Sequence, residues 1–362
     1  MSTTAASFPA SAPTGEIVFK TKTIDFDGRR NILIQNENGP CALLALINYI
    51  LLTVDHLSAP EIHDLVALVN SSNEIPLSGL LNYLQQIVTA NQRTYGIPPE
   101  EVQTTLSFLP SLHEGLNINP QFDGTFSPSH ELALFRDFNV PLVHGWLVDP
   151  SAPEYRGVIK YNSYETAQNV LVEAYDVEQK PNKDSVDLEI IDDSRQIKSF
   201  FARTATQLTD YGLHYLRENL QNNSIAVLFR NDHFATIIKK DNDIYALVTD
   251  VGFATKKSFV WESLLSINGA NNSFFTGNFS PILEDSSNPF DDSNVDNDDL
   301  NSAEERDRAL AIAMQEEEDN RVATNLQKRY EKNNNKAKKS PKEEKKQKKA
   351  KDGKKKKSCI IM

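Results

Sequence analysis

Cys41 is the residue of this chain whose type and setting most clearly suggest chemistry. It follows the polar run QNENGP at residues 35–40 and precedes the apolar run ALLALINYILL. Apolar residues recur in that run at helical spacing, so Cys41 is expected at the N-terminus of a helix, with Pro40 in the first turn. The positive end of the helix dipole would lower the pKa of the thiol and favour the nucleophilic thiolate. Without such a setting, a lone cysteine is a small buried hydrophobe.

Gln35 is the candidate oxyanion donor for a cysteine nucleophile. Acyl transfer needs a donor for the oxyanion of the tetrahedral intermediate. Gln35 lies six residues before Cys41, and a papain-like cysteine protease places its oxyanion glutamine at the same spacing. The two residues together therefore predict a papain-like thiol hydrolase more strongly than either one alone.

The same chemistry requires a base, which the papain-like chain order puts far downstream, on a sheet that faces the helix. His233 is the best candidate of the seven histidines, because it separates two apolar runs at the predicted start of a strand. His144 and His214 are the alternatives. Surface or packing roles are expected for His56, His63, His113 and His130. The group that orients the base is left open among Asp232, Thr249 and Asp250.

The elements that must position these residues follow from the hydrophobic pattern. Short β-branched pieces predict strands over residues 17–34, and apolar runs predict strands at 140–148, 224–230, 234–240 and 243–250. Helices are predicted at 42–52, 60–70, 76–88, 99–112, 130–139, 161–176 and 202–221. Loops are expected at 115–129 and 177–200, and a hairpin turn at Lys240–Asp243. Helices followed by an antiparallel meander indicate an α+β fold, with the helical half packed on the sheet.

The charge distribution divides the chain of 362 residues into a folded part and a tail. Residues 284–320 carry 2 Lys/Arg against 14 Asp/Glu, whereas residues 321–362 carry 17 against 4. Blocks of like charge are typical of solvated tails. We therefore expect a disordered leader at 1–15, a catalytic domain at 16–283 and an acidic linker at 284–302. A short binding helix is expected at 303–320, followed by a basic disordered tail at 321–358.

Cysteine usage and apolar content exclude several classes of protein. Two cysteines are too few for a disulfide scaffold or a four-thiolate zinc site, and they suggest a reducing compartment. The N-terminus has no secretory signal pattern, and no apolar run is long enough for a membrane helix. Neither a metal nor an organic cofactor is expected.

Four spaced segments resemble the MINDY deubiquitinases. They are QNENGPC with LLA behind it, HGWLVDP at 144–150, FRNDHF at 229–234, and VTD at 248–250 continuing through GF to VWESL at 260–264. The resemblance spans about residues 17–283 and implies a papain-like isopeptidase that prefers lysine-48-linked ubiquitin chains. It also implies that Cys41 is the nucleophile, His233 the general base and Gln35 the oxyanion residue. Two departures occur, because family members commonly have proline at the position of Ala42 and glutamine at that of Val251.

The resemblance further implies a set of ubiquitin contacts. They fall on Asn117, Ile118, Trp146, Tyr164 and Phe229, with core packing as the alternative for each. A second contact is expected in the acidic tract, where the order Asp, Leu-Ala, Met-Gln, Glu resembles an inverted ubiquitin-interacting motif. Its narrow apolar face consists of Leu310, Ala311 and Met314.

The last four residues, Cys359-Ile-Ile-Met362, form a C-a-a-X prenylation box at 359–362. A terminal methionine favours farnesylation of Cys359. The lysine run at 354–357 lies directly upstream, and a prenyl group with polybasic charge is the combination that stable membrane binding needs. The tail lacks interleaved aromatic residues and the folded domain is acidic, so nucleic acid is not an expected partner.

The sequence thus predicts a monomeric thiol deubiquitinase of lysine-48-linked polyubiquitin. It would be cytoplasmic and partly held at an anionic membrane surface through the farnesylated Cys359. One alternative is a ubiquitin-chain-binding membrane adaptor that keeps the fold without turnover. Another is a cysteine acyltransferase that acts on lipids or small amides.

Overall fold

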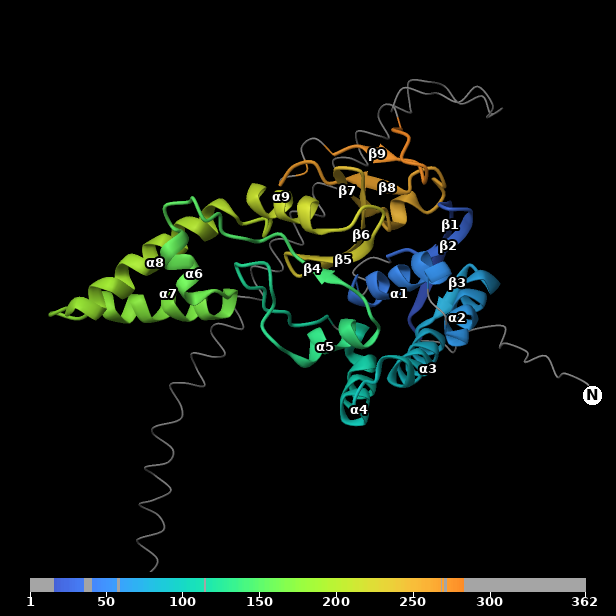
Figure 1. Ribbon diagram of the computed structural model, residues 1–362, viewed down its shortest axis with the longest axis horizontal. Helices are drawn as coiled ribbons and strands as arrows, with labels where there is room; N and C mark the ends of the chain where they lie inside the picture. Colours follow the sequence, from blue (N-terminus) through green and yellow to red (C-terminus); the bar gives the residue numbers. More distant parts are fainter. Residues whose placement is uncertain are drawn as a thin grey trace, which may run out of the picture. The chain divides into compact units, whose positions relative to one another are not determined.

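The described part of the chain combines helices with two β-sheets (Figure 1). The structure is a computed structural model, and it describes residues 16–35, 41–56, 59–113, 115–267, 269 and 272–282. The strands are β1 (Val18–Asp25), β2 (Arg29–Leu33), β3 (Glu74–Pro76), β4 (Leu142–Val143), β5 (Ile225–Arg230), β6 (His233–Lys240), β7 (Asp243–Leu247), β8 (Trp261–Ser263) and β9 (Phe274–Phe275). The expected α+β class is confirmed.

The helices account for most of the remaining described residues. They are α1 (Cys41–Thr53), α2 (Pro60–Ser71), α3 (Leu77–Tyr95), α4 (Pro99–Phe108), α5 (His130–Asp137), α6 (Tyr155–Tyr161), α7 (Tyr164–Glu178), α8 (Ser185–Arg203) and α9 (Asp210–Asn219). Short 3₁₀ helices are η1 (Val54–His56), η2 (Leu109–His113) and η3 (Val251–Phe253). No described helix is long and apolar enough to cross a lipid bilayer.

The larger sheet is the antiparallel meander that the sequence predicts. Its strand order is β4-β5-β6-β7-β8-β9, and only β4 pairs in parallel, with β5. The turn between β5 and β6 has two residues, Asn231 and Asp232, with φ of 51° and 58°. These are the residue types that tolerate left-handed backbone and allow a tight hairpin. The predicted hairpin between Lys240 and Asp243 is also confirmed, because these two residues pair where β6 meets β7.

The smaller sheet has the strand order β2-β1-β3, and the helix α1 packs between it and the larger sheet. Every residue of α1 after Cys41 is buried, as expected for a helix that is apolar on all sides. Two polar contacts fix its position. The Thr236 hydroxyl on β6 donates to the Ala45 carbonyl at 3.2 Å. The Asn48 side chain pairs with both backbone groups of Leu33, at 2.8 and 2.9 Å.

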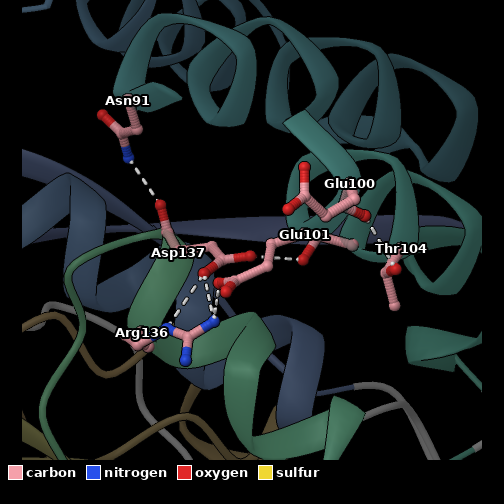
Figure 2. Close-up of polar contacts among 7 residues, drawn as sticks. Asn91, Glu100, Glu101, Thr104, Arg136 and Asp137 are labelled. Carbon is pink, nitrogen blue, oxygen red and sulfur yellow. Dashed lines mark hydrogen bonds and ion pairs between the residues drawn. The ribbon is translucent and has the colours of Figure 1, made fainter. Parts of the chain in front are cut away.

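A buried polar cluster joins α3, α4 and α5 below this core (Figure 2). The Asp137 carboxylate is fully buried and accepts from the Thr105 hydroxyl at 2.5 Å. Arg136 donates to the same carboxylate at 3.1 Å and also pairs with Glu101. The Asn91 amide donates to the Asp137 carbonyl at 3.0 Å. These contacts hold the end of α5 in place, just before the chain enters β4.

The predicted loop at 177–200 is wrong, because most of it lies in the helix α8. This helix begins with a capping box, in which Asp184 and Asp187 accept from each other's backbone N–H groups. Its buried face includes Ile191, Ile197 and Phe200, and the last two pack in the same cluster as α7. The helical period was not recognised in the sequence because this stretch has few apolar residues among many polar ones. In Figure 1, α6, α7 and α8 project together away from the sheets.

Other element boundaries also differ from the prediction, and the helix expected at 76–88 extends to Tyr95. The helix expected at 161–176 begins at Tyr164 and is preceded by the separate helix α6. The helix expected at 202–221 is largely α9, and residues 204–209 are not helical. The strand expected at 140–148 is only Leu142–Val143. The rest of the predicted strand, residues 144–148, packs against the start of α9. The two backbones are so close there that a Cβ on Gly212 would lie 1.8 Å from the Gly145 oxygen.

Candidate active site

Cys41 is the first residue of α1, as the sequence predicts, and its side chain is half-buried. The thiol receives hydrogen bonds from three backbone N–H groups, those of Cys41 itself, Ala42 and Phe234. These donors lower the pKa of the thiol, but its burial and the nearby Asp232 carboxylate raise it more. The predicted depression of the Cys41 pKa is therefore wrong for this structure, since desolvation outweighs the helix N-terminus. Residues 36–40, including Pro40, lie outside the described part.

The β5–β6 hairpin, which carries the predicted base, lies beside this thiol. His233 is the first residue of β6, it pairs with Arg230 across the tight turn, and its side chain is exposed. The next residue, Phe234, donates its backbone N–H to the Cys41 sulfur. Two positions nearly two hundred residues apart therefore meet at the same place.

Gln35 lies just beyond the end of β2 and bridges in parallel to Asp250. Its backbone N–H donates to the Thr249 carbonyl at 2.7 Å. The amide pairing of Asn48 with Leu33 ties this end of β2 to α1, the helix that begins with Cys41. The segment that carries Gln35 is thus held on one side by α1 and on the other by the chain that follows β7.

The three candidates for the orienting group lie in two different places. The charge of Asp232 acts on the Cys41 thiol, so this carboxylate is close to the nucleophile. Thr249 and Asp250 contact the backbone of Gln35 instead. The Asp250 carboxylate accepts from the Gly252 N–H at 2.6 Å and so caps η3.

The other described histidine side chains do not compete with His233 for the thiol. His144 is buried, its Nε2 lies 2.8 Å from the Thr125 carbonyl oxygen, and its Nδ1 accepts from the Trp146 N–H at 3.2 Å. Burial lowers the pKa of His144 to about 4, so its imidazole is neutral at pH 7. The exposed histidines on helices away from the hairpin are His63, His130 and His214. The side chains of His56 and His113 lie outside the described part.

The predicted ubiquitin contacts separate into surface and core residues. Asn117 is exposed, and Tyr164 is half-buried at the start of α7. Burial and the charge of Asp232 raise the pKa of Tyr164, which places this ring near the β5–β6 hairpin. The structure does not present Ile118, Trp146 and Phe229 on the surface, because they are only 6%, 3% and 2% exposed.

The buried members of this set have packing partners instead. The Trp146 ring lies 5.3 Å from that of Tyr164, and its indole N–H donates to the Thr204 hydroxyl at 2.7 Å. The Phe229 ring lies 5.1 Å from that of Phe234, directly behind the segment that reaches Cys41. In this structure these residues support the surface around the site and do not form it.

Two buried polar residues beside this region were missed in the sequence. Asn48 is a single amide inside an otherwise apolar helix, and Lys22 is a buried lysine in a strand with alternating burial. In both cases the sequence does contain a signal, which is a polar residue at a position where the pattern predicts an apolar one. No cluster of His, Cys, Asp and Glu that could hold a metal ion occurs among the described residues. The predicted tail sites at Leu310, Ala311, Met314 and Cys359 lie outside them.

Comparison with known proteins identifies the family of the chain. The family model of the MINDY deubiquitinases matches residues 17–279. Ubiquitin carboxyl-terminal hydrolase MIY1 of Saccharomyces cerevisiae is 38% identical over 323 residues, which cover 87% of this chain and 88% of the yeast protein. Ubiquitin carboxyl-terminal hydrolase MINDY-2 of Homo sapiens is 31% identical over 263 residues, which cover 71% of this chain and 40% of the human protein. The chain therefore belongs to the MINDY deubiquitinase family and is a deubiquitinase, a hydrolase.

Proposed function

We propose that this deubiquitinase uses Cys41 as its nucleophile to hydrolyse isopeptide bonds in lysine-48-linked polyubiquitin. His233 is the general base and Gln35 the oxyanion donor, in a papain-like arrangement. The observation that supports this assignment best is the hydrogen bond from the Phe234 N–H to the Cys41 sulfur, because it brings the base-bearing hairpin to the nucleophile.

The raised pKa of Cys41 determines how the reaction begins. At neutral pH the free thiol keeps its proton, so His233 must accept it as the sulfur attacks the carbonyl of ubiquitin's C-terminal glycine. The tetrahedral oxyanion is stabilised by the Gln35 amide. His233 then gives the proton to the departing lysine amine, and water hydrolyses the thioester to release ubiquitin and regenerate the thiol.

Turnover of lysine-48-linked tetraubiquitin tests this assignment directly. Cys41→Ala and His233→Ala should each lose cleavage while still binding the chain, because binding does not require the thiol or the imidazole. His214→Ala is the matched control, since His214 is exposed on α9 and should be dispensable. Equal cleavage by wild type and Cys41→Ala would refute the proposal. A panel of other linkages measures the proposed preference.

Substrate contact is proposed for the exposed part of the predicted set, Asn117 and Tyr164. Tyr164 lies near the hairpin, so a ubiquitin whose C-terminus enters the site would lie within its reach. Asn117→Ala and Tyr164→Ala should raise KM for tetraubiquitin with a smaller effect on kcat. Tyr95→Ala on α3 is the control, because Tyr95 is 51% exposed and distant in sequence from both predicted contacts. An unchanged KM in both variants would remove these residues from the contact set.

The tail is proposed to bind ubiquitin and a membrane. The acidic helix would contact ubiquitin weakly through Leu310, Ala311 and Met314 and raise the local concentration of substrate. Farnesylation of Cys359 beside four lysines would hold part of the monomeric, cytoplasmic enzyme at an anionic surface. Metabolic farnesyl labelling should be present in wild type and absent in Cys359→Ser. No label in wild type would contradict the lipid anchor.

A further inference from the structure

Lys22 is a buried lysine on β1 with an unusual partner. Its side chain is 2% exposed, and its ammonium donates to the Phe259 carbonyl at 2.6 Å. Among the described residues it forms no ion pair with a carboxylate. A buried ammonium costs free energy unless it is paired, and a methionine would fill the same space without that cost. The contribution of Lys22 is therefore not explained by packing.

The contact with Phe259 reaches the segment that holds Gln35. Phe259 is the next-to-last residue of the connection between β7 and β8, which spans residues 248–260. The Val248 N–H joins the two ends of this connection by donating to the Val260 carbonyl at 2.9 Å. Near its beginning, Thr249 and Asp250 pair with Gln35. The β7–β8 connection is thus contacted from the side of the smaller sheet near both of its ends. Gln35 contacts it near its beginning, and Lys22 contacts it near its end.

We propose that Lys22 is a positioning residue that clamps the β7–β8 connection against the smaller sheet and so fixes the backbone at Gln35 for oxyanion binding. The inference rests on the proposed role of Gln35. If the connection moved away from β1, the hydrogen bond from the Gln35 N–H to Thr249 would move with it. A displacement of about 1 Å at an oxyanion donor is enough to slow the chemical step while leaving substrate binding intact.

The charge of Lys22 is sensitive to pH in the range where the enzyme would be assayed. Burial lowers the pKa of Lys22 to about 8, and no neighbouring charge contributes to the shift. Charged residues on the elements packed around β1 are Arg29 and Arg30 of β2, Glu74 of β3, Asp250, Lys256 and Lys257 of the connection, and Glu262 of β8. Above pH 8 the neutral amine is a weaker donor to Phe259, because the hydrogen bond is no longer charge-assisted. The clamp should loosen as pH rises.

Steady-state cleavage of lysine-48-linked tetraubiquitin by Lys22→Met tests the proposal. The variant should lower kcat about tenfold with KM nearly unchanged, and it should lose the wild-type decline in kcat above pH 8. Lys22→Arg keeps its charge at high pH, so it should retain kcat and move that decline upward. Lys20→Met on the same strand is the matched control, because Lys20 is exposed. A wild-type kcat in Lys22→Met, or a loss equal to that in Lys20→Met, would overturn the proposal.

Hydrogen exchange of the full chain separates this inference from the proposed function. Amides of residues 248–260 should exchange faster in Lys22→Met than in wild type or Lys20→Met, whether or not the enzyme turns over. Unchanged exchange there would refute the clamp. A wild type that fails to cleave any chain would refute the proposed function, whereas faster exchange would still support the clamp. Should Lys22→Met not fold, the pH profile and exchange of Lys22→Arg decide the matter, and wild-type behaviour in both would overturn it.

Discussion

Replacement of Asn48 by leucine should destabilise the protein by about 3 kcal/mol. The Asn48 side chain is fully buried and makes hydrogen bonds of 2.8 and 2.9 Å to the two backbone groups of Leu33. Leucine has a similar volume, so the main change is that a buried N–H and a buried C=O lose their partners. Each unsatisfied group costs about 1–3 kcal/mol, and the greater apolarity of leucine offsets part of the total.

Urea denaturation at pH 7 measures this change as a lower midpoint with an unchanged slope. Asn169→Leu on α7 is the matched control, because Asn169 is exposed and its replacement should change stability by less than about 0.5 kcal/mol. The kcat of Asn48→Leu should also fall under conditions where the variant is fully folded, since Leu33 precedes the segment that carries Gln35. A stability within about 0.5 kcal/mol of wild type would show that the paired amide does not hold β2 to α1.

Three further predictions follow from buried titratable groups. Burial lowers the pKa of His144 to about 4, so the folded state favours the neutral imidazole and stability should decline as pH falls from about 6.5 towards 4. The loss in the free energy of unfolding approaches about 3 kcal/mol. In urea denaturation at pH 5 and 7, His144→Gln should show a smaller difference in stability than wild type. An equal decline in the variant would contradict the assignment. Thr105→Val removes the hydroxyl that donates to the buried Asp137 carboxylate at 2.5 Å, and it should lower the free energy of unfolding by about 2 kcal/mol in thermal unfolding. An unchanged Tm would show that Arg136 alone satisfies the Asp137 carboxylate. Because the pKa of the Cys41 thiol is raised, iodoacetamide should alkylate it at pH 7.5 more slowly in the folded Cys359→Ser variant than after denaturation; faster labelling of the folded form would refute the raised pKa.

The position of the catalytic hairpin could be predicted because its signals are local. Two apolar runs with β-branched residues flank Asn231 and Asp232, and these residue types accept the positive φ that a two-residue turn needs. The signal for the helix after Cys41 is equally local, since apolar residues fill the run to Leu52 except at Asn48. Local patterns of this kind determine which residues begin and end an element, and here they placed both Cys41 and His233 correctly at element starts.

The features that the sequence did not predict depend on contacts between distant segments. The pairing of Asn48 with Leu33 and that of Lys22 with Phe259 become visible only when the two sheets and α1 are assembled. The helix α8 was missed for a related reason. Its N-terminus is fixed by a capping box and its buried face packs with α7, and neither feature appears in the sequence as a dense apolar run. The burial of Trp146 likewise depends on aromatic rings from α7 and α8.

The thiol environment determines when the nucleophile can form. Backbone N–H groups of Ala42 and Phe234 are already directed at the sulfur, so the fold provides stabilisation for a thiolate before any substrate arrives. Burial and, to a smaller extent, the Asp232 charge nevertheless raise the pKa of the thiol above its ordinary value. The Phe234 donor and the Asp232 charge both come from the hairpin that carries His233, so a small change in the position of this hairpin alters both influences together. With the proposed roles of Cys41 and His233, the nucleophile would form as its proton passes to that imidazole, because the raised pKa of the thiol disfavours a thiolate before substrate binds.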